Sequence, residues 1–152
     1  MGSLAGLLKA RGLEITGSDR ALYPPMSTAL ADWGIDVIEG FRPENVLNRC
    51  PDLVVIGNAV RGDNPEALAA IEAGLSYRSF SDALFEVAMV SKHRLAVCGT
   101  HGKTTTTSLC AYLLHATGRD PSFLVGGIAL DFEGPFREGS GKHFVVEGDE
   151  YD

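Results

Sequence analysis

Residues 95–107 read LAVCGTHGKTTTT, and this stretch decides how the rest of the chain is interpreted. The apolar run Leu95–Cys98 predicts a strand, and the spacing of Leu109 and Leu113 predicts that a helix follows. Glycines between the two allow a tight turn and let main-chain N–H groups approach an anion at the start of the helix. A strand, a glycine loop and a helix in this order indicate a phosphate-binding loop.

Individual side chains of this loop have chemistry that suits a nucleoside triphosphate. Lys103 can reach the β- and γ-phosphates, and the Thr104 hydroxyl can ligate Mg²⁺. The loop is shorter than the usual Walker loop, because Val97 stands where that pattern requires glycine. The alternative is an ordinary strand-to-helix turn capped by a threonine. The predicted nucleotide-binding residues are Gly99, Thr100, His101, Gly102, Lys103, Thr104 and Thr105.

A second strand near the end of the sequence carries an acidic group. Phe144–Val146 leads into Glu147, and ligands of open α/β sheets bind at the carboxyl ends of the strands. We expect Glu147 to hold Mg²⁺ and to act with Lys103 in catalysis, with Asp149 and Glu150 as weaker candidates. The alternative is a solvated acidic tail, which is how most short acidic runs behave.

Outward from these motifs, short apolar strands alternate with helices, which predicts a parallel α/β sheet. The run Leu53–Ile56 predicts a strand buried on both faces, and Gly126–Gly127 predicts a loop. A polar segment, Ser91–Arg94, marks a boundary between 1–91 and 92–152. The predicted helices are Ser3–Ala10, Met26–Trp33, Pro65–Ala73, Asp82–Val90 and Gly102–Thr117, and the predicted strands are Leu13–Gly17, Asp36–Ile38, Asp52–Gly57, Tyr77–Phe80, Leu95–Cys98 and His143–Glu147.

Charge and cysteine content bound the class of protein. A net charge of -7 and a pI of about 5.0 argue against a sequence-independent nucleic-acid binder, which needs clustered Lys and Arg. The three cysteines show neither a zinc spacing nor the even count of a disulfide framework. No apolar run approaches the roughly 18 to 20 residues that span a bilayer. We expect a cytoplasmic protein with neither nucleic acid nor membrane as a partner.

The two motifs together resemble a known family. GTHGKTTTT at 99–107 with EGDE at 147–150 is similar to the Mur ligases of bacterial cell-wall synthesis, particularly those that extend UDP-N-acetylmuramate. The resemblance implies a Rossmann-like UDP-sugar-binding domain at 1–91, whose first strand and glycine-rich turn are expected before Ser3. It implies the start of a P-loop-type ATPase domain at 92–152, with ATP and Mg²⁺ as cofactors and an acyl phosphate as intermediate.

Other residues bear on which amine such a ligase joins. Tyr23–Ser27, Gly57–Val60 and Glu147–Asp152 look like the members that attach L-alanyl-γ-D-glutamyl-meso-diaminopimelate in peptidoglycan recycling. Asp63–Glu66 is equally at home in the members that attach L-alanine. The resemblance therefore implies UDP-N-acetylmuramate and a tripeptide or an amino acid as partners.

The same resemblance indicates which residues meet the UDP-sugar. We expect contacts from Ser18, Asp19, Asn58 and Asn64. An alternative exists for Asp19, because an acid that follows a strand often caps the next turn.

Two rival functions fit part of the pattern. Folylpolyglutamate synthetase shares the ATPase core, but the half of the chain before the loop and the histidine of the loop, His101, argue against it. A non-catalytic nucleotide-binding module would need only the loop. An enzyme needs further strands and helices, and we expect the natural reading frame to supply them beyond both ends of residues 1–152.

Overall fold

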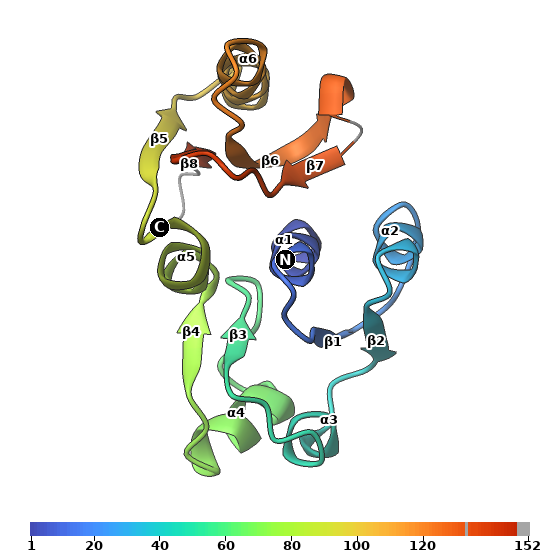
Figure 1. Cartoon of the computed structure of the whole chain (residues 1–152). Helices are drawn as coiled ribbons and strands as arrows, with labels where there is room; N and C mark the ends of the chain where they lie inside the picture. The colour runs from blue at the N-terminus through green and yellow to red at the C-terminus, as the bar shows by residue number, and fades with distance from the viewer. Residues whose placement is uncertain (133, 149–152) are drawn as a thin grey trace. The chain divides into compact units, whose positions relative to one another are not determined.

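The computed structural model describes residues 1–132 and 134–148. Both of its compact units alternate helices with strands, as Figure 1 shows, so the chain has a mixed α/β fold with parallel strands. Among the described residues, no helix is long and apolar enough to cross a membrane. The first unit comprises Met1–Gly2 with Glu14–Glu86, and the second comprises Ser3–Leu13 with the residues from Val87 onward.

The first unit contains two parallel sheets of two strands each. Strand β1 (Thr16–Asp19) pairs with β2 (Asp36–Glu39), and β3 (Val54–Ile56) pairs with β4 (Tyr77–Ser79). A helix connects the two strands of each pair, which is the connection that parallel strands require. The helices are α2 (Met26–Asp32), α3 (Pro43–Leu47), α4 (Pro65–Glu72) and α5 (Phe80–Ala83), which continues into the π-helical segment η1 (Leu84–Met89).

Helix α4 shows how local residues fix the boundaries of an element. Pro65 occupies the first turn, where its missing N–H costs no hydrogen bond. The Asn64 side chain caps the helix by accepting hydrogen bonds from the N–H groups of Glu66 and Ala67 at 2.9 and 3.1 Å. Gly74, with a φ of +71°, ends the helix in a left-handed conformation. The predicted helix at this place is confirmed.

Two strands of the first unit differ from the prediction by more than one residue. The strand predicted at Leu13–Gly17 begins later, as β1, because Leu13 closes the end of helix α1 (Gly2–Ala10). The N–H of Leu13 donates to the carbonyl of Leu8 at 3.2 Å. The strand predicted at Asp52–Gly57 is confined to β3, and its residues are half-buried instead of buried on both faces. Among the described residues, β3 pairs with β4 alone, so one of its edges contributes no pairing.

The second unit contains a four-stranded sheet with a long helix packed across it. The strand order is β5-β8-β6-β7, in which β7 (Gly134–Arg137) is an antiparallel edge. The three parallel strands are β5 (His93–Cys98), β8 (His143–Gly148) and β6 (Ser122–Ala129). Helix α6 (Lys103–Ala116) contacts all three of them (Figure 1). Its contact with the sheet is centred on the buried residues Ala111, Phe123, Val125 and Val145.

Within this unit, the strand β6 is the main departure from the prediction. The sequence predicts a loop at Gly126–Gly127, whereas both glycines lie inside β6, and β7 is an additional strand. Phe123 and Val125, which precede the glycines, are fully buried and hold the main chain in the sheet. By contrast, the boundaries predicted for α6 and β8 agree with the structure to within one residue at each end.

The connection from β7 to β8 is fixed by polar contacts at the amino end of the parallel strands. Asp120 accepts hydrogen bonds from the N–H and the hydroxyl of Ser140, each at 2.7 Å. Lys92 donates from Nζ to the carbonyls of Gly139 and Gly141 at 3.1 and 2.6 Å. A short loop is thereby held by side chains from two other segments.

Candidate functional site

The glycine loop joins the end of β5 to the start of α6 at the carboxyl edge of the sheet. Gly99 and Gly102 have φ values of +151° and +73°, in the range that favours glycine. Gly102 is the N-cap of α6, and because it has no side chain it leaves the N–H groups of the first turn uncovered. The helix begins with a bond from the Thr106 N–H to the Gly102 carbonyl at 2.9 Å. Helix starts of this kind bind anions.

The polar side chains of the loop are accessible. Lys103 donates from Nζ to the carbonyl of Gly99 at 2.8 Å, and this contact is exposed. Thr100, His101 and Thr105 are exposed as well. A phosphate at the helix start would compete with the carbonyl for the lysine ammonium, because the phosphate carries a negative charge and the carbonyl is neutral.

Strand pairing brings Glu147 to this loop. In the parallel ladder, Val97 of β5 lies beside Glu147 of β8, and Cys98 lies beside Gly148. The hydroxyl of Thr104, in the first turn of α6, donates to Oε2 of Glu147 at 3.2 Å. Thr104 and Glu147, which the sequence analysis predicts as magnesium ligands, are thus in contact, although they are 43 positions apart in the sequence.

Close packing joins the ends of β5 and β8 beside the loop. The Cys98 sulfur lies so near the Cα of Gly148 that a Cβ at position 148 would overlap it. An alanine at 148 would therefore require the Cys98 side chain or the local main chain to shift.

A third element reaches the same place, and sequence reasoning does not identify it. The N–H of Gly126, in β6, donates to Oε1 of Glu147 at 2.9 Å. A Cβ on Gly127 would lie 3.1 Å from the methyl carbon Cγ2 of Thr104. The sequence signal for a strand here is the apolar run Phe123–Val125, although its pairing beside β8, which brings the glycines to Glu147, is visible only in the structure.

Oxygen atoms are the groups that could hold a metal ion at this edge. Thr104 supplies a hydroxyl and Glu147 a carboxylate, hard ligands of the kind that Mg²⁺ takes together with phosphate and water oxygens. Within 1–132 and 134–148, no group of three or more His, Cys, Asp and Glu side chains could hold a metal ion. The donor set therefore fits an ion held mainly by a nucleotide. Asp149 and Glu150 lie outside the described residues.

Two of the residues predicted to meet the UDP-sugar lie at the end of β1, in the first unit. Ser18 donates to Oε1 of Glu66 at 2.7 Å, and Asn45 donates to Oε2 of the same carboxylate at 3.0 Å. Asp19 is exposed and accepts a hydrogen bond from the N–H of Arg20 at 2.6 Å. Helix α4 thus holds Ser18 through Glu66, while the carboxylate of Asp19 faces solvent.

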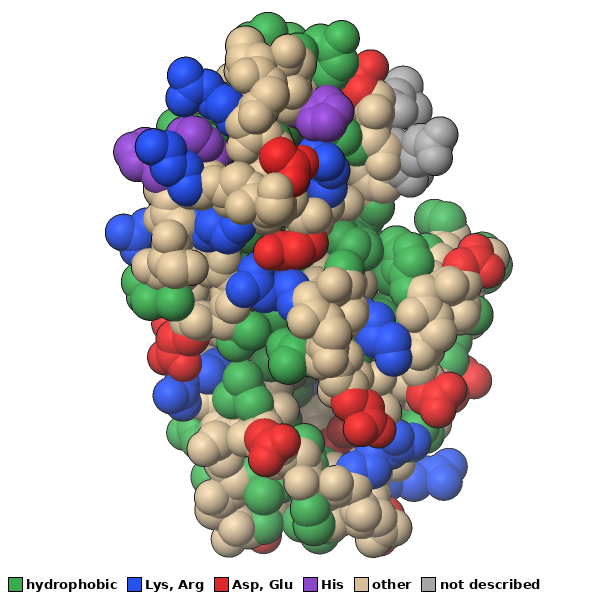
Figure 2. Space-filling model, viewed as in Figure 1, with side chains coloured by type: hydrophobic (Ala, Val, Ile, Leu, Met, Phe, Trp, Pro, Cys, Tyr) green, Lys and Arg blue, Asp and Glu red, His purple; other side chains and the backbone are tan. Residues whose placement is uncertain are grey.

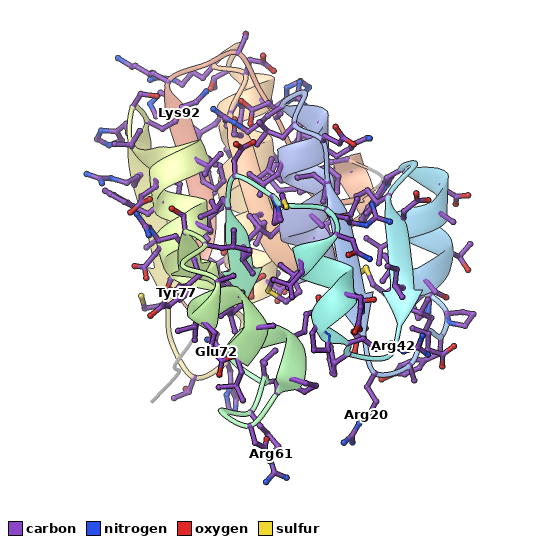
Figure 3. All side chains as sticks on the ribbon, turned by 90° about the horizontal axis from the view of Figure 1, so that it is seen from below. Arg20, Arg42, Arg61, Glu72, Tyr77 and Lys92 are labelled. Carbon is purple, nitrogen blue, oxygen red and sulfur yellow. The ribbon has the colours of Figure 1, made fainter. Side chains whose placement is uncertain are left out.

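The two predicted asparagines have different surroundings. Asn58 follows β3 in an exposed turn, whereas Asn64 is 8% exposed and uses its side-chain oxygen to cap α4. Arg61, between them, projects away from the ribbon in Figure 3 and pairs with Asp63 at 3.4 Å. Asn58 presents its amide to solvent, and Asn64 fixes the start of a helix.

Charged side chains are spread over the surface. Figure 2 shows Lys and Arg side chains interspersed with Asp and Glu side chains on the face in view. Several form ion pairs, such as Arg78 with Glu86 at 2.9 Å and Arg11 with Glu138 at 2.8 Å. The described residues of this face do not form the basic stripe that follows a nucleic-acid backbone.

Known proteins resemble the chain along its whole length. The family model described as Mur ligase family, catalytic domain, matches residues 1–91. The chain is 43% identical over 152 residues to the UDP-N-acetylmuramate--L-alanyl-gamma-D-glutamyl-meso-2,6-diaminoheptandioate ligase of Escherichia coli (strain K12), covering 100% of this chain and 33% of that protein. It is 37% identical over 151 residues to the UDP-N-acetylmuramate--L-alanine ligase of Alkaliphilus metalliredigens (strain QYMF), covering 99% and 32%.

Solved structures have the same fold. The UDP-N-acetylmuramate:L-alanyl-gamma-D-glutamyl-meso-diaminopimelate ligase from Neisseria meningitides matches with a TM-score of 0.92 at 38% identity, over 100% of this chain and 50% of that chain. A murein peptide ligase from Psychrobacter arcticus 273-4 gives 0.88 at 38%, over 100% and 36%. The UDP-N-acetylmuramate-alanine ligase from Thermotoga maritima gives 0.85 at 29%, over 97% and 34%.

The chain spans about a third of the length of the curated relatives that it matches. The family model alone matches 91 of its 152 residues, and the resemblance that the glycine loop first indicated is confirmed. This chain belongs to the Mur ligase family.

Proposed function

We propose that the chain is part of a cytoplasmic murein peptide ligase, which uses ATP to join L-alanyl-γ-D-glutamyl-meso-diaminopimelate to UDP-N-acetylmuramate in peptidoglycan recycling. In this proposal, residues 1–91 bind the UDP-sugar and 92–152 begin a P-loop-type ATPase domain. The observation that carries it is the 3.2 Å contact between Thr104 and Glu147 at the glycine loop. This contact supports the proposal because a hydroxyl and a carboxylate together suit a magnesium ion on a nucleotide.

The loop binds the phosphates of ATP in this proposal. N–H groups at the start of α6 and the ammonium of Lys103 neutralise the β- and γ-phosphates, while Thr104 and Glu147 orient the magnesium ion. That ion, when bound, withdraws charge from the phosphate oxygens. Lys103 meets the charge on the γ-phosphoryl group as it passes to the lactyl carboxylate of UDP-N-acetylmuramate and ADP leaves. The amine then attacks the acyl phosphate, forms the amide and releases phosphate.

The UDP-sugar is assigned to the first unit. Exposed polar groups at the end of β1 and after β3, namely Asp19 and Asn58, contact the ligand directly in this proposal. Ser18, which Glu66 holds by a hydrogen bond, lies beside Asp19. Asn64 contributes by fixing the start of α4. Positioning of this kind matters because both reactants must be oriented before phosphoryl transfer.

The solved structures favour the tripeptide as the amine. The two peptide-ligase structures match with higher TM-scores and identities than the alanine ligase, 0.92 and 0.88 at 38% against 0.85 at 29%. L-Alanine stays as the alternative, because an alanine ligase from Kineococcus radiotolerans (strain ATCC BAA-149 / DSM 14245 / SRS30216) is 42% identical over 154 residues, covering 100% of this chain and 32% of that protein.

Phosphate release by the intact gene product tests the proposal. The protein is supplied with ATP, Mg²⁺ and UDP-N-acetylmuramate, and either L-alanine or the tripeptide is added. Turnover that depends on the tripeptide is the expected result. Turnover with L-alanine alone would move the protein to the alanine ligases, and no turnover with either amine would contradict the proposed ligase activity.

A further inference from the structure

The end of strand β6 changes partner at the edge of the sheet. Its parallel register with β8 pairs Phe123 with Val145 and Leu124 with Val146. Beyond Leu124 this register stops, and the N–H of Gly126 turns to the side chain of Glu147. The carboxylate of Glu147, in β8, thus accepts the hydrogen bond that a main-chain carbonyl would accept in a regular ladder.

Both oxygens of that carboxylate are engaged, each by a different element. Oε1 of Glu147 accepts from the Gly126 N–H at 2.9 Å, and Oε2 accepts from the Thr104 hydroxyl at 3.2 Å. A carboxylate held at both oxygens has a defined orientation, and partners of this kind set the geometry of metal ligands. Gly126 donates from the main chain, so its contribution depends on the path of β6 and not on a side chain.

The neighbouring glycine acts on the other candidate ligand. A Cβ at Gly127 would lie 3.1 Å from Cγ2 of Thr104, so the methyl group occupies the space that a side chain would need. The methyl and the hydroxyl of threonine share one χ1 angle, and β-branched side chains are stiff about it. A Cβ at 127 would push this methyl aside, and because both groups turn about χ1, it would also move the hydroxyl of Thr104 relative to Glu147.

We propose that Gly126 and Gly127 of β6 form a positioning element for Thr104 and Glu147, in which the lack of a side chain at 127 leaves the Thr104 methyl group in its place. This inference rests on the proposed function, in which those two residues ligate the magnesium ion. It adds a third segment to the site, supplied by a strand rather than by the glycine loop.

The test measures Mn²⁺ binding with a non-hydrolysable ATP analogue, by electron paramagnetic resonance, in the intact gene product. Gly127→Ala should weaken Mn²⁺ binding by about 10- to 100-fold, the loss typical of altered metal-ligand partners. Thr104→Ser removes the methyl that the new Cβ would meet and keeps the hydroxyl. The double variant should therefore bind Mn²⁺ as well as Thr104→Ser alone.

The control is Gly134→Ala, which adds a methyl group to β7 of the same sheet, where the nearest atom is 3.9 Å away. It should bind Mn²⁺ as the unmodified protein does. The inference is overturned if Gly127→Ala binds Mn²⁺ normally, or if the two substitutions weaken binding independently. A merely structural role would lower the melting temperature of Gly127→Ala and leave Mn²⁺ binding by the folded protein unchanged.

The contribution of Gly126 to positioning Glu147 is tested by amide hydrogen exchange after glycine-selective isotope labelling. Its amide proton should exchange slowly in the unmodified protein and faster in Glu147→Ala, and equal rates would remove Gly126 from the element. Loss of the proposed function is a separate outcome. A fully active Lys103→Ala protein would reject the nucleotide site itself. If Lys103→Ala is inactive but Gly127→Ala binds Mn²⁺ normally, only the positioning element is rejected.

Discussion

The two ends of the sheet in the second unit are built differently. At the amino end, Asp120 accepts two hydrogen bonds from Ser140 and pairs with Arg137 at 2.5 Å. At the carboxyl end, Lys103 has a single exposed contact with a loop carbonyl, and each oxygen of Glu147 accepts one hydrogen bond. At the amino end, Asp120, Ser140 and Arg137 satisfy one another's hydrogen bonds, whereas at the carboxyl end the remaining lone pairs of Glu147 could coordinate a ligand. We therefore expect stability to depend mainly on the amino end of these strands, and ligand binding on their carboxyl end.

The largest expected effect is on activity at the carboxyl end. Lys103→Ala should lower ligase activity by about 100- to 1,000-fold, because a donor to the transferred phosphoryl group is lost. Its melting temperature should stay close to that of the unmodified protein, since the lysine contact is exposed. Lys9→Ala, in helix α1, is the control and should stay active. An active Lys103→Ala protein would contradict the division between the two ends.

At the amino end, the expected effect is on stability. A Cβ at Gly141 would overlap the carbonyl oxygen of Arg119 and lie 2.6 Å from that of Asp120. Gly141→Ala should therefore cost roughly 1–3 kcal/mol in the free energy of unfolding, measured by urea denaturation. Gly62→Ala meets no atom within 4 Å and should change it by about 0.5 kcal/mol at most. Equal urea midpoints for the two variants would show that the loop is not tightly packed.

A smaller effect concerns acid. Hydrogen bonds from Ser140, with a lesser contribution from Arg137, lower the pKa of Asp120 from 3.8 to about 2. Because the pKa is lower in the folded than in the unfolded state, the stabilisation is present above about pH 4 and is lost as the pH falls toward 2. In Asp120→Asn, the urea midpoint should change less with pH between about pH 4 and 2 than it does in the unmodified protein. Parallel curves for both proteins would contradict the role of the carboxylate.

The smallest expected effect involves His143, which is 9% exposed and whose Nδ1 finds no hydrogen-bond partner among residues 1–132 and 134–148. Burial, together with the cations Arg119, His93 and Lys142, lowers the pKa of His143 below its ordinary 6.5. The unfolded chain therefore takes up the proton first, and stability falls as the pH drops from about 6.5 toward the lower folded pKa. His143→Phe should remove this slope from urea midpoints measured between about pH 7.5 and 5.5. A slope that persists in the variant would assign the effect to another group.

Elements with strong local signals could be predicted from the sequence. Helix α6 lies between Gly102 and Gly118, whose left-handed φ values mark its two ends. Strand β8 is an apolar run that leads into Glu147. Helix α3, only five residues long, was not predicted, because Pro43–Leu47 is too short for a helical period to be recognised.

The candidate site could be predicted only in part, because its geometry depends on pairing between distant strands. The loop residues and Glu147 can each be predicted from their own local sequence motif. The contact of Glu147 with Gly126 follows from the position of β6 beside β8, which no local pattern encodes. Glycines are ordinary loop signals, and burial of the preceding Phe123–Val125 overrides that signal here. The roles assigned to Lys103 and the other site residues stay predictions.

The packing of Cys98 against Gly148 has a consequence for sequence variation among relatives. Since a side chain at 148 would overlap the Cys98 sulfur unless that sulfur shifts, we expect the two positions to vary together. Relatives that carry alanine at the position of Gly148 should carry glycine or alanine at that of Cys98, and relatives with a larger residue at 98 should keep glycine at 148. Positions 98 and 148, beside the glycine loop, would then form a covarying pair in an alignment of relatives. This covariation differs from the invariance expected of residues that touch ATP.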